Sequence, residues 1–342
     1  MSHHIGIDVH DNLSTLQHMD EEGYLGFQIT IPTEKEEFAR VLDKLDQPTT
    51  ITFEAGRNYF WLYEFFSQHP KVIKTNVVDA RRSRNIASEL STLAGYGRAK
   101  NDMIDAEMLA EESRRGLVPC IHVPTAKQME QRTFNRHRID LTAQRTRMVN
   151  KMQGFLRLRG IGIKTGELTG NPESQKDVFS LLRKYDSIVL SHYIYLIKHI
   201  ETFIVECDES LDHLLPLSHP QLKIITSAPG FGPVLGRTVY TEILDIAYFN
   251  TDRSIVNYSG LAPIENESNR KKGRICLNHF TNHYLKYAFV EAAHHASTHI
   301  KYRKKYELDV KKHGKIRAKL NLARRLAKTV YWMLVRQQLF RQ

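Results

Sequence analysis

Four acidic side chains of this sequence have the type and placement that metal binding requires. Asp8 follows the alternating Ile5 and Ile7 in "HHIGIDVH", and Glu54 comes at the end of the apolar run in "TTITFEAG". Alternation and β-branched residues predict two strands, each ending on a carboxylate. The alternative for Asp8 is a surface aspartate that closes an edge strand, and one carboxylate alone does not decide between the two.

The other two acids lie together on a segment with a helical pattern. Asp102 and Asp105 are three residues apart in "KNDMIDAEMLAEESRR". On a helix they project from one face, and Ala106 and Leu109 mark the side that packs. Two carboxylates held this close repel each other unless a cation lies between them. The pair therefore adds to the indication of a cation site.

The order of the expected strands and helices brings these acids to one place. Residues 3–32 are expected to form three antiparallel strands, and strands at 49–56 and 71–80 then alternate with helices, which is an α/β pattern. In an RNase H-like fold the first strand lies beside a later one, and a helix after the sheet crosses their ends. Gly6 keeps the first strand open to close approach. The order of elements therefore predicts an α/β N-terminal domain, and an RNase H-like arrangement of it would bring all four carboxylates together.

Four carboxylates gathered at the edge of a sheet would bind a hard cation. Oxygen ligands suit Mg²⁺, and two such ions about 4 Å apart can stabilise both the attacking and the leaving oxygen of a phosphodiester. Without a cation the cluster would be costly or would take up protons. The sequence therefore predicts Mg²⁺ bound by Asp8, Glu54, Asp102 and Asp105.

Two long amphipathic helices are expected in the middle of the chain, from Thr125 to about residue 159 and from about residue 175 to 214. The segment 160–172, which contains glycine and proline, would join them. Such a pair forms an antiparallel helical hairpin, here a coiled coil, and arms of this kind often mediate association between subunits. The final third is expected to be mainly helical.

Two motifs in the final third are less specific. "PGFG" is a Gly-x-Gly turn that leads into a helix, where backbone amides can hold a phosphate. A plain turn between helices is the alternative. His294, His295 and His299 lie about one helical turn apart and could chelate a metal. No further ligand completes a hydrolase motif, so a cluster on the helix surface is the favoured interpretation.

The positive charge of the chain is concentrated at its end. The formal net charge is +11, and from residue 300 onward 14 Lys and Arg residues stand against only Glu307 and Asp309. Clustered lysine and arginine are favoured by contacts with phosphates, so the distribution indicates a polyanion partner. A solvated helical face is the alternative.

Composition excludes several classes of protein. With 41% hydrophobic and 25% charged residues among 342, the chain has the composition of a globular protein with two or three domains. No run of 18 apolar residues and no basic apolar leader is present, so we expect a cytoplasmic protein without a membrane span. Cys120, Cys207 and Cys276 are far apart, which argues against a zinc or disulfide framework.

Several short motifs together resemble one family. "IGID" carries Asp8, "FEAG" carries Glu54, and "KNDMIDA" matches a K-x-D-x-x-D-A signature that begins at Lys100. "PGFG" and "GLAP", residues 260–263, match two later motifs. Over nearly its whole length the sequence is similar to the DEDD transposases of the IS110 and IS1111 group, which are related to the Piv and MooV recombinases.

The resemblance implies an organisation and a set of partners. It implies a RuvC-like catalytic domain at 1–122, a coiled-coil hairpin at 123–215 and a transposase domain at 216–342. It implies a nucleophilic serine a few residues after G-L-x-P, which is Ser268 here; Ser259 is the second candidate. It also implies that a noncoding RNA of the element, a bridge RNA, pairs with donor and target DNA.

The serine chemistry needs help from cations. A serine hydroxyl is a poor nucleophile at neutral pH unless a metal or a nearby cation activates it. A covalent phosphoserine would conserve the bond energy, so that strands could rejoin without ATP. Basic residues near Ser268 and in the tail are the expected nucleic-acid contacts, together with Lys100: Arg270, Lys271, Lys272, Arg274, Lys304, Lys305, Lys311, Lys312, Arg324 and Arg325.

Four hypotheses follow from these observations. The leading one is an RNA-guided transposase that works as a homodimer or a dimer of dimers. A Piv-like site-specific DNA invertase would keep the fold and differ in its genomic neighbourhood. A RuvC-like hydrolytic nuclease would cleave DNA without Ser268. A nucleic-acid-binding protein without enzymatic activity would be unaffected by Asp102→Ala.

Overall fold

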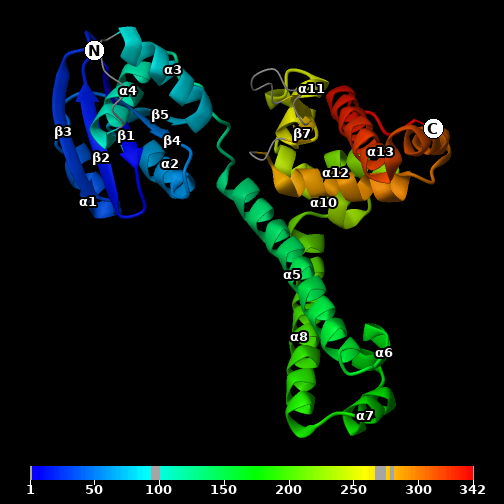
Figure 1. Ribbon diagram of the computed structural model, residues 1–342. Helices are drawn as coiled ribbons and strands as arrows, with labels where there is room; N and C mark the ends of the chain where they lie inside the picture. Colours follow the sequence, from blue (N-terminus) through cyan, green and yellow to red (C-terminus); the bar gives the residue numbers. More distant parts are fainter. Residues whose placement is uncertain (1, 94–100, 266–274, 278–280, 342) are drawn as a thin grey trace, which may run out of the picture. The chain divides into compact units, whose positions relative to one another are not determined.

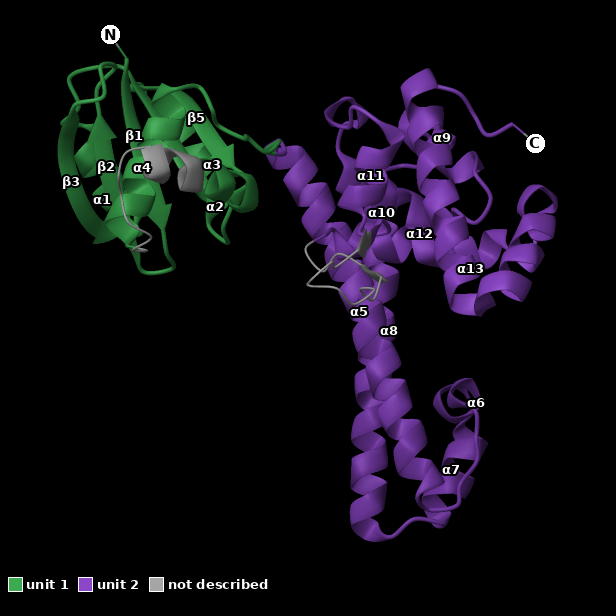
Figure 2. Cartoon of the chain, turned by 45° about the horizontal axis from the view of Figure 1, so that its top comes forward, with its two compact units in different colours: residues 1–123 green, residues 124–342 purple. Residues whose placement is uncertain are grey.

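The computed structural model describes residues 2–93, 101–265, 275–277 and 281–341. The chain divides into two units, Met1–Val123 and Pro124–Gln342, which Figure 2 shows in different colours. Each unit has a hydrophobic core of its own.

The N-terminal unit is built on a five-stranded mixed sheet with the order β3-β2-β1-β4-β5 (Figure 1). β1 pairs antiparallel with β2 and parallel with β4, while β2 pairs antiparallel with β3 and β4 parallel with β5. The expected antiparallel start and the expected α/β continuation are both present. The strand bounds are β1 (His3–Val9), β2 (Leu13–Met19), β3 (Leu25–Pro32), β4 (Thr49–Glu54) and β5 (Val72–Val78).

Helices cover both faces of this sheet. Ile5 and Ile7 are fully buried and pack in one core with Phe38 of α1 and Phe66 of α2. Since side chains alternate along a strand, Gly6 and Asp8 face the other side, where α4 lies. The helix bounds are α1 (Lys35–Leu42), α2 (Tyr59–Gln68), α3 (Ala80–Leu93) and α4 (Asp102–Arg114).

Gly6 allows α4 to lie directly on the backbone of β1. A Cβ atom at this position would be 2.0 Å from the Ala106 carbonyl oxygen and 2.4 Å from the Ala110 nitrogen. Near the start of the strand, His4 Nδ1 lies 2.9 Å from Ser113 Oγ, near the end of the helix. The helix therefore runs antiparallel to β1, and its first turn lies at the carboxyl end of the strand.

In the C-terminal unit, α5 (Ala126–Arg157) and α8 (Lys184–Leu214) run antiparallel, side by side (Figures 1 and 2). Ion pairs join them, with Arg138 Nε 2.9 Å from Asp208 Oδ1. The second helix begins at Lys184 and not near residue 175 as expected. Two short helices, α6 (Thr165–Gly170) and α7 (Pro172–Ser180), precede it, because Asn171 caps α7 and Pro172 starts it.

In the part of the chain that the structure describes, α8 alone is long and apolar enough to span a membrane by length and composition. The sequence prediction concerned an unbroken run of 18 apolar residues, and α8 is not one, because polar residues such as Lys198 and Glu201 interrupt it. Composition alone does not separate a membrane helix from an apolar helix that packs on protein, and α8 packs on α5. Its exposed side chains include Tyr185, Tyr195, Phe203 and Val205, so an apolar surface faces away from α5.

The remainder of the C-terminal unit is mainly helical, as expected. Its core contains the fully buried Phe289, Leu326 and Val330. The described elements are α9 (Pro220–Ser227), α10 (Pro233–Ile243), η1 (Ile246–Tyr248), α11 (Asp252–Tyr258), β6 (Pro263–Glu265), β7 (Ile275–Leu277), α12 (His283–Ala296) and α13 (Ile300–Arg336). α13 is kinked at Gly314, whose φ is +80°.

Candidate active site

The four carboxylates singled out in the sequence line a single cavity of about 330 Å³ in the N-terminal unit. Asp8 lies on β1 and Glu54 at the end of the neighbouring parallel strand β4, where Ile7 is the register partner of Phe53. Asp102 and Asp105 come from the first turn of α4. Adjacent strands and a helix that crosses their ends therefore supply the four acids together.

Local structure explains why α4 presents its acids here. Asn101 caps the helix, because its side-chain oxygen accepts a hydrogen bond of 3.2 Å from the Met103 amide. Ala106 and Leu109 are buried as expected, which turns the opposite side of the first turn outward. Acids are also favoured in the first turn because the helix dipole is positive there.

His10 belongs to the same cavity and was not singled out in the sequence. Its Nε2 lies 3.3 Å from Asp8 Oδ2 and 3.6 Å from Asp102 Oδ1. One ligand atom from each of the three residues lies within 4.8 Å of the others. The signal available in the sequence was a histidine two residues after the strand-ending aspartate.

A buried acid lies behind the cavity. Glu112 of α4 is fully buried, and both of its carboxylate oxygens accept 2.9 Å hydrogen bonds from Ser83 Oγ. Burial, assisted by the negative charge of Glu54, raises the pKa of Glu112 to about 7. Ser83 and Arg84 of α3 line the cavity itself. Glu112 lies two helical turns beyond Asp105, so the spacing of acids along α4 would have identified it.

The donor set of this cavity fits divalent metal ions. Several carboxylates converge from three elements, and they offer the oxygen ligands that hard cations prefer. Asp8 and Asp102 also have a nitrogen donor beside them in His10. Because side chains from α4, β1 and β4 surround one open space, an ion bound there would contact several of them at once.

Of the two candidate serines, only Ser259 lies among the residues that the structure describes. Ser268, its basic neighbours Arg270, Lys271, Lys272 and Arg274, and Lys100 lie outside the residues that the structure describes. Ser259 is described and is fully buried, and its hydroxyl donates a 3.1 Å hydrogen bond to the Val256 carbonyl at the end of α11. That hydroxyl stabilises a helix end and faces no solvent.

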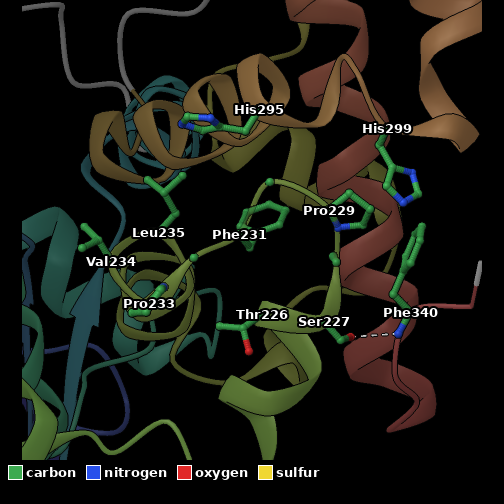
Figure 3. Close-up of a pocket in the computed structure, with 13 residues that line it drawn as sticks. Thr226, Ser227, Pro229, Phe231, Pro233, Val234, Leu235, His295, His299 and Phe340 are labelled. Atoms are coloured by element: carbon green, nitrogen blue, oxygen red, sulfur yellow. Dashed lines mark hydrogen bonds between the residues drawn. The ribbon is translucent and has the colours of Figure 1, made fainter.

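The glycine turn between α9 and α10 borders a second cavity, of about 690 Å³. Figure 3 shows Pro229, Phe231, His295 and His299 around it, with Phe340 at its edge. Gly230 has a φ of +91°, and a Cβ there would lie 2.2 Å from the Ala292 carbonyl oxygen, so glycine is required. His299 caps α13, which gives it a structural role.

The predicted basic contacts on α13 are of two kinds: exposed lysines, and arginines that bond to other parts of the protein. Lys304, Lys305, Lys311 and Lys312 are exposed on α13. Arg324 is half-buried and donates to the Leu261 carbonyl, and desolvation lowers its pKa. Arg325 lies 3.0 Å from Asp309. Of these six predicted contacts, the four lysines are therefore open to solvent, whereas the two arginines are held by contacts within the protein.

Comparisons with known proteins relate both units of the chain to one group of transposases. A family model for IS110-type DEDD transposases matches residues 5–159, and a second, described as the transposase IS116/IS110/IS902 family, matches residues 222–307. The first matched range contains all four carboxylates of the cavity and the strands that carry two of them. The N-terminal unit thus carries the DEDD transposase domain of the first model, and its mixed five-stranded sheet is consistent with the RNase H-like, RuvC-like fold that this domain implies.

Individual relatives show the same relationship. The protein y4rJ of Sinorhizobium fredii is 27% identical over 244 residues, which is 63% of this chain and 57% of that protein. The transposase for insertion sequence element IS1111A of Coxiella burnetii is 24% identical over 251 residues, 71% of this chain and 68% of the relative. A 44.8 kDa protein of insertion element IS116 from Streptomyces clavuligerus is 23% identical over 295 residues, 71% and 73% of the two chains. The chain belongs to the IS110 family of transposases.

Proposed function

We propose that this protein cuts and rejoins DNA for an insertion sequence, with Mg²⁺ bound by Asp8, Glu54, Asp102 and Asp105. The observation that carries the proposal is the convergence of these four carboxylates on one cavity. When bound there, the metal would stabilise negative charge on the attacking and leaving oxygens of a phosphodiester.

The residues of the chain have distinct tasks around the cavity. The acids on β1, β4 and α4 hold the metal, and the close contact of α4 with Gly6 fixes the distance between them. Arg84 on the cavity wall supplies a positive charge for a phosphate oxygen, which charge-assisted hydrogen bonds would bind. Positioning and electrostatic stabilisation are the main contributions that phosphoryl transfer needs from a protein.

We propose Ser268 as the nucleophile. Its oxygen would form a bond to phosphorus while the bond from phosphorus to a deoxyribose oxygen breaks; the serine loses its proton and the departing sugar oxygen gains one. The reverse reaction with another strand completes recombination. Support comes from the position of Ser268 after "GLAP" and from the four basic residues that follow it, which would neutralise the developing charge.

The partners proposed are donor and target DNA and a noncoding guide RNA of the element. We also propose a homodimer or a dimer of dimers in the cytoplasm, in which the exposed apolar side chains of α8 make the α5–α8 arm a coiled-coil contact between subunits. The corresponding domains would be 1–122, 123–215 and 216–342.

The direct test is an adduct assay. Purified protein, RNA transcribed from the element's flanks and labelled junction DNA are incubated with Mg²⁺ and separated on a denaturing gel. DNA attached covalently to protein, lost in both Ser268→Ala and Asp102→Ala, supports serine recombination at a carboxylate metal site. If DNA is cleaved without forming an adduct, and if this cleavage persists in Ser268→Ala, the protein is instead a hydrolytic nuclease.

The exposed lysines of α13 should bind nucleic acid without regard to sequence. Replacing Lys304, Lys305, Lys311 and Lys312 by glutamine should weaken binding of RNA and DNA alike and reduce the slope of log affinity against log salt by up to about 4. The measurement is fluorescence anisotropy over a range of salt concentrations.

A matched control removes four lysines that are exposed on or beside the α5–α8 arm: Lys164, Lys176, Lys184 and Lys198. The two quadruple variants change the net charge equally. An equal loss of salt dependence in both would show that overall charge, and not the α13 surface, determines binding.

A further inference from the structure

We propose that His10 is a ligand of the metal centre, so that the site combines a nitrogen donor with its carboxylates. The role of His10 rests on the carboxylate metal site proposed above. Its imidazole lies between an acid of β1 and an acid of α4, with Nε2 at 3.3 Å from Asp8 Oδ2 and 3.6 Å from Asp102 Oδ1.

These distances suit a shared ion better than direct hydrogen bonds. N–H···O hydrogen bonds have their most common length at about 2.9 Å and are seldom longer than about 3.2 Å. An octahedral ion with ligands at about 2.1 Å places neighbouring ligand atoms about 3 Å apart. The three donor atoms of Asp8, His10 and Asp102 all lie within 4.8 Å of one another, so a small contraction would place them around one cation.

The backbone of His10 is fixed from both sides. Its amide donates a 3.0 Å hydrogen bond to the Leu13 carbonyl, which closes the turn between β1 and β2. Its carbonyl accepts a 2.9 Å hydrogen bond from Thr33 Oγ1, at the end of β3. The side chain is 58% exposed, so a metal and its substrate can reach it. A residue with a fixed backbone and an accessible ring has the properties of a positioned ligand.

A nitrogen donor changes which ions the site prefers. Neutral imidazole is a common ligand of transition metals, whereas Mg²⁺ is bound almost entirely through oxygen. With His10 the centre should favour Mn²⁺ or Co²⁺ over Mg²⁺ more strongly than a site made of carboxylates alone. His10 and Asp102 also line a neighbouring cavity of about 340 Å³, so open space adjoins the imidazole there as well.

The test detects nitrogen bound to the metal without using catalysis. Mn²⁺ is added to the full chain, and electron spin echo spectroscopy records coupling between bound Mn²⁺ and ¹⁴N. We expect a histidine nitrogen signal in the wild type that disappears in His10→Ala, together with at least a tenfold loss of Mn²⁺ affinity and a smaller loss for Mg²⁺. Thermal melts establish that the variant is folded.

Controls separate the role of His10 from the metal site itself. His192 is exposed on α8, and His192→Ala should leave the nitrogen signal unchanged. If Asp8→Asn abolishes Mn²⁺ binding while the wild type shows no ¹⁴N coupling, the carboxylate site is upheld and the proposal for His10 is overturned. If Mn²⁺ binding survives both Asp8→Asn and Asp102→Asn, the carboxylate site fails, and the role of His10 fails with it.

Discussion

Each unit buries a glutamate, and the two units compensate the buried carboxylate in different ways. Glu242 of α10 is paired with Arg136 of α5 by two hydrogen bonds of 2.7 Å and also accepts a hydrogen bond of 2.6 Å from Asn282. Glu112 of α4 has the hydroxyl of Ser83 as its hydrogen-bond donor, and its pKa is raised to about 7. One buried acid is neutralised by a cation, the other by uptake of a proton near neutral pH.

Asp102, one of the cavity acids, follows neither pattern. Asp102 is 59% exposed and borders the same open space as Asp8, Glu54 and Asp105. A protein that needs an acid for stability buries it with a partner, as at Glu242. A group of acids around a space that solvent can enter is instead suited to a cation from outside.

The largest effect is expected from Glu242→Gln. The substitution leaves the Arg136 guanidinium beside a neutral group, and we expect it to lower the free energy of unfolding by about 3 kcal/mol, the lower end for a broken buried pair because Arg136 is partly exposed. Urea denaturation measures the change. Glu307→Gln is the control: its pair with Arg303 is exposed and should be worth no more than about 1 kcal/mol. Equal losses of unfolding free energy in the two variants would show that the buried pair contributes no more than the exposed one.

Glutamine in place of Glu112 should not lower the free energy of unfolding at alkaline pH, in contrast to glutamine in place of Glu242. The folded pKa of about 7 lies above the ordinary value of 4.5, so the native state holds a proton that the unfolded state releases. Stability therefore falls as pH rises from 4.5 towards 7, by up to about 3 kcal/mol. Glu112→Gln should remove this fall and match or exceed wild-type stability at pH 8. Denaturation at several pH values tests it, and an unchanged pH profile in the variant would refute it.

A smaller effect is expected from Gly6→Ala. The added methyl group would collide with the backbone of α4 at Ala106 and Ala110, at a cost of roughly 1–3 kcal/mol for overpacking. It should also weaken Mn²⁺ binding, because α4 carries Asp102 and Asp105. Gly56→Ala, where a Cβ meets no heavy atom within 4 Å, should change neither property. Calorimetry of unfolding and of Mn²⁺ binding distinguishes the two variants.

Much of this site could be predicted because its residues follow simple spacings. Strand alternation placed Asp8 opposite Ile5 and Ile7, and a spacing of three placed Asp102 and Asp105 on one helix face. The order of strands and helices was sufficient to bring the two pairs together. Local pattern and fold topology point the same way here, which is when sequence reasoning works best.

The parts that were missed depend on contacts between distant segments. The backbone of His10 is held by a hydrogen bond from Thr33 Oγ1 to its carbonyl, and no spacing along the chain encodes that contact. The spacing of acids along α4 marks the position of Glu112 but not its hydrogen-bond donor, which is Ser83, 29 residues earlier. The start of α8 was placed too early because the apolar pattern continues across the junction at Leu181, whereas capping and the helix start at Pro172 divide the segment.

The central claim is that the four carboxylates together bind divalent metal, and anomalous diffraction from crystals soaked in Mn²⁺ tests it most directly. The account predicts an anomalous peak inside the cavity, within bonding distance of Asp8 and Asp102 oxygens, that disappears in crystals of Asp8→Asn. Mn²⁺ peaks found only elsewhere on the molecule, or a cavity peak that persists in Asp8→Asn, would contradict it.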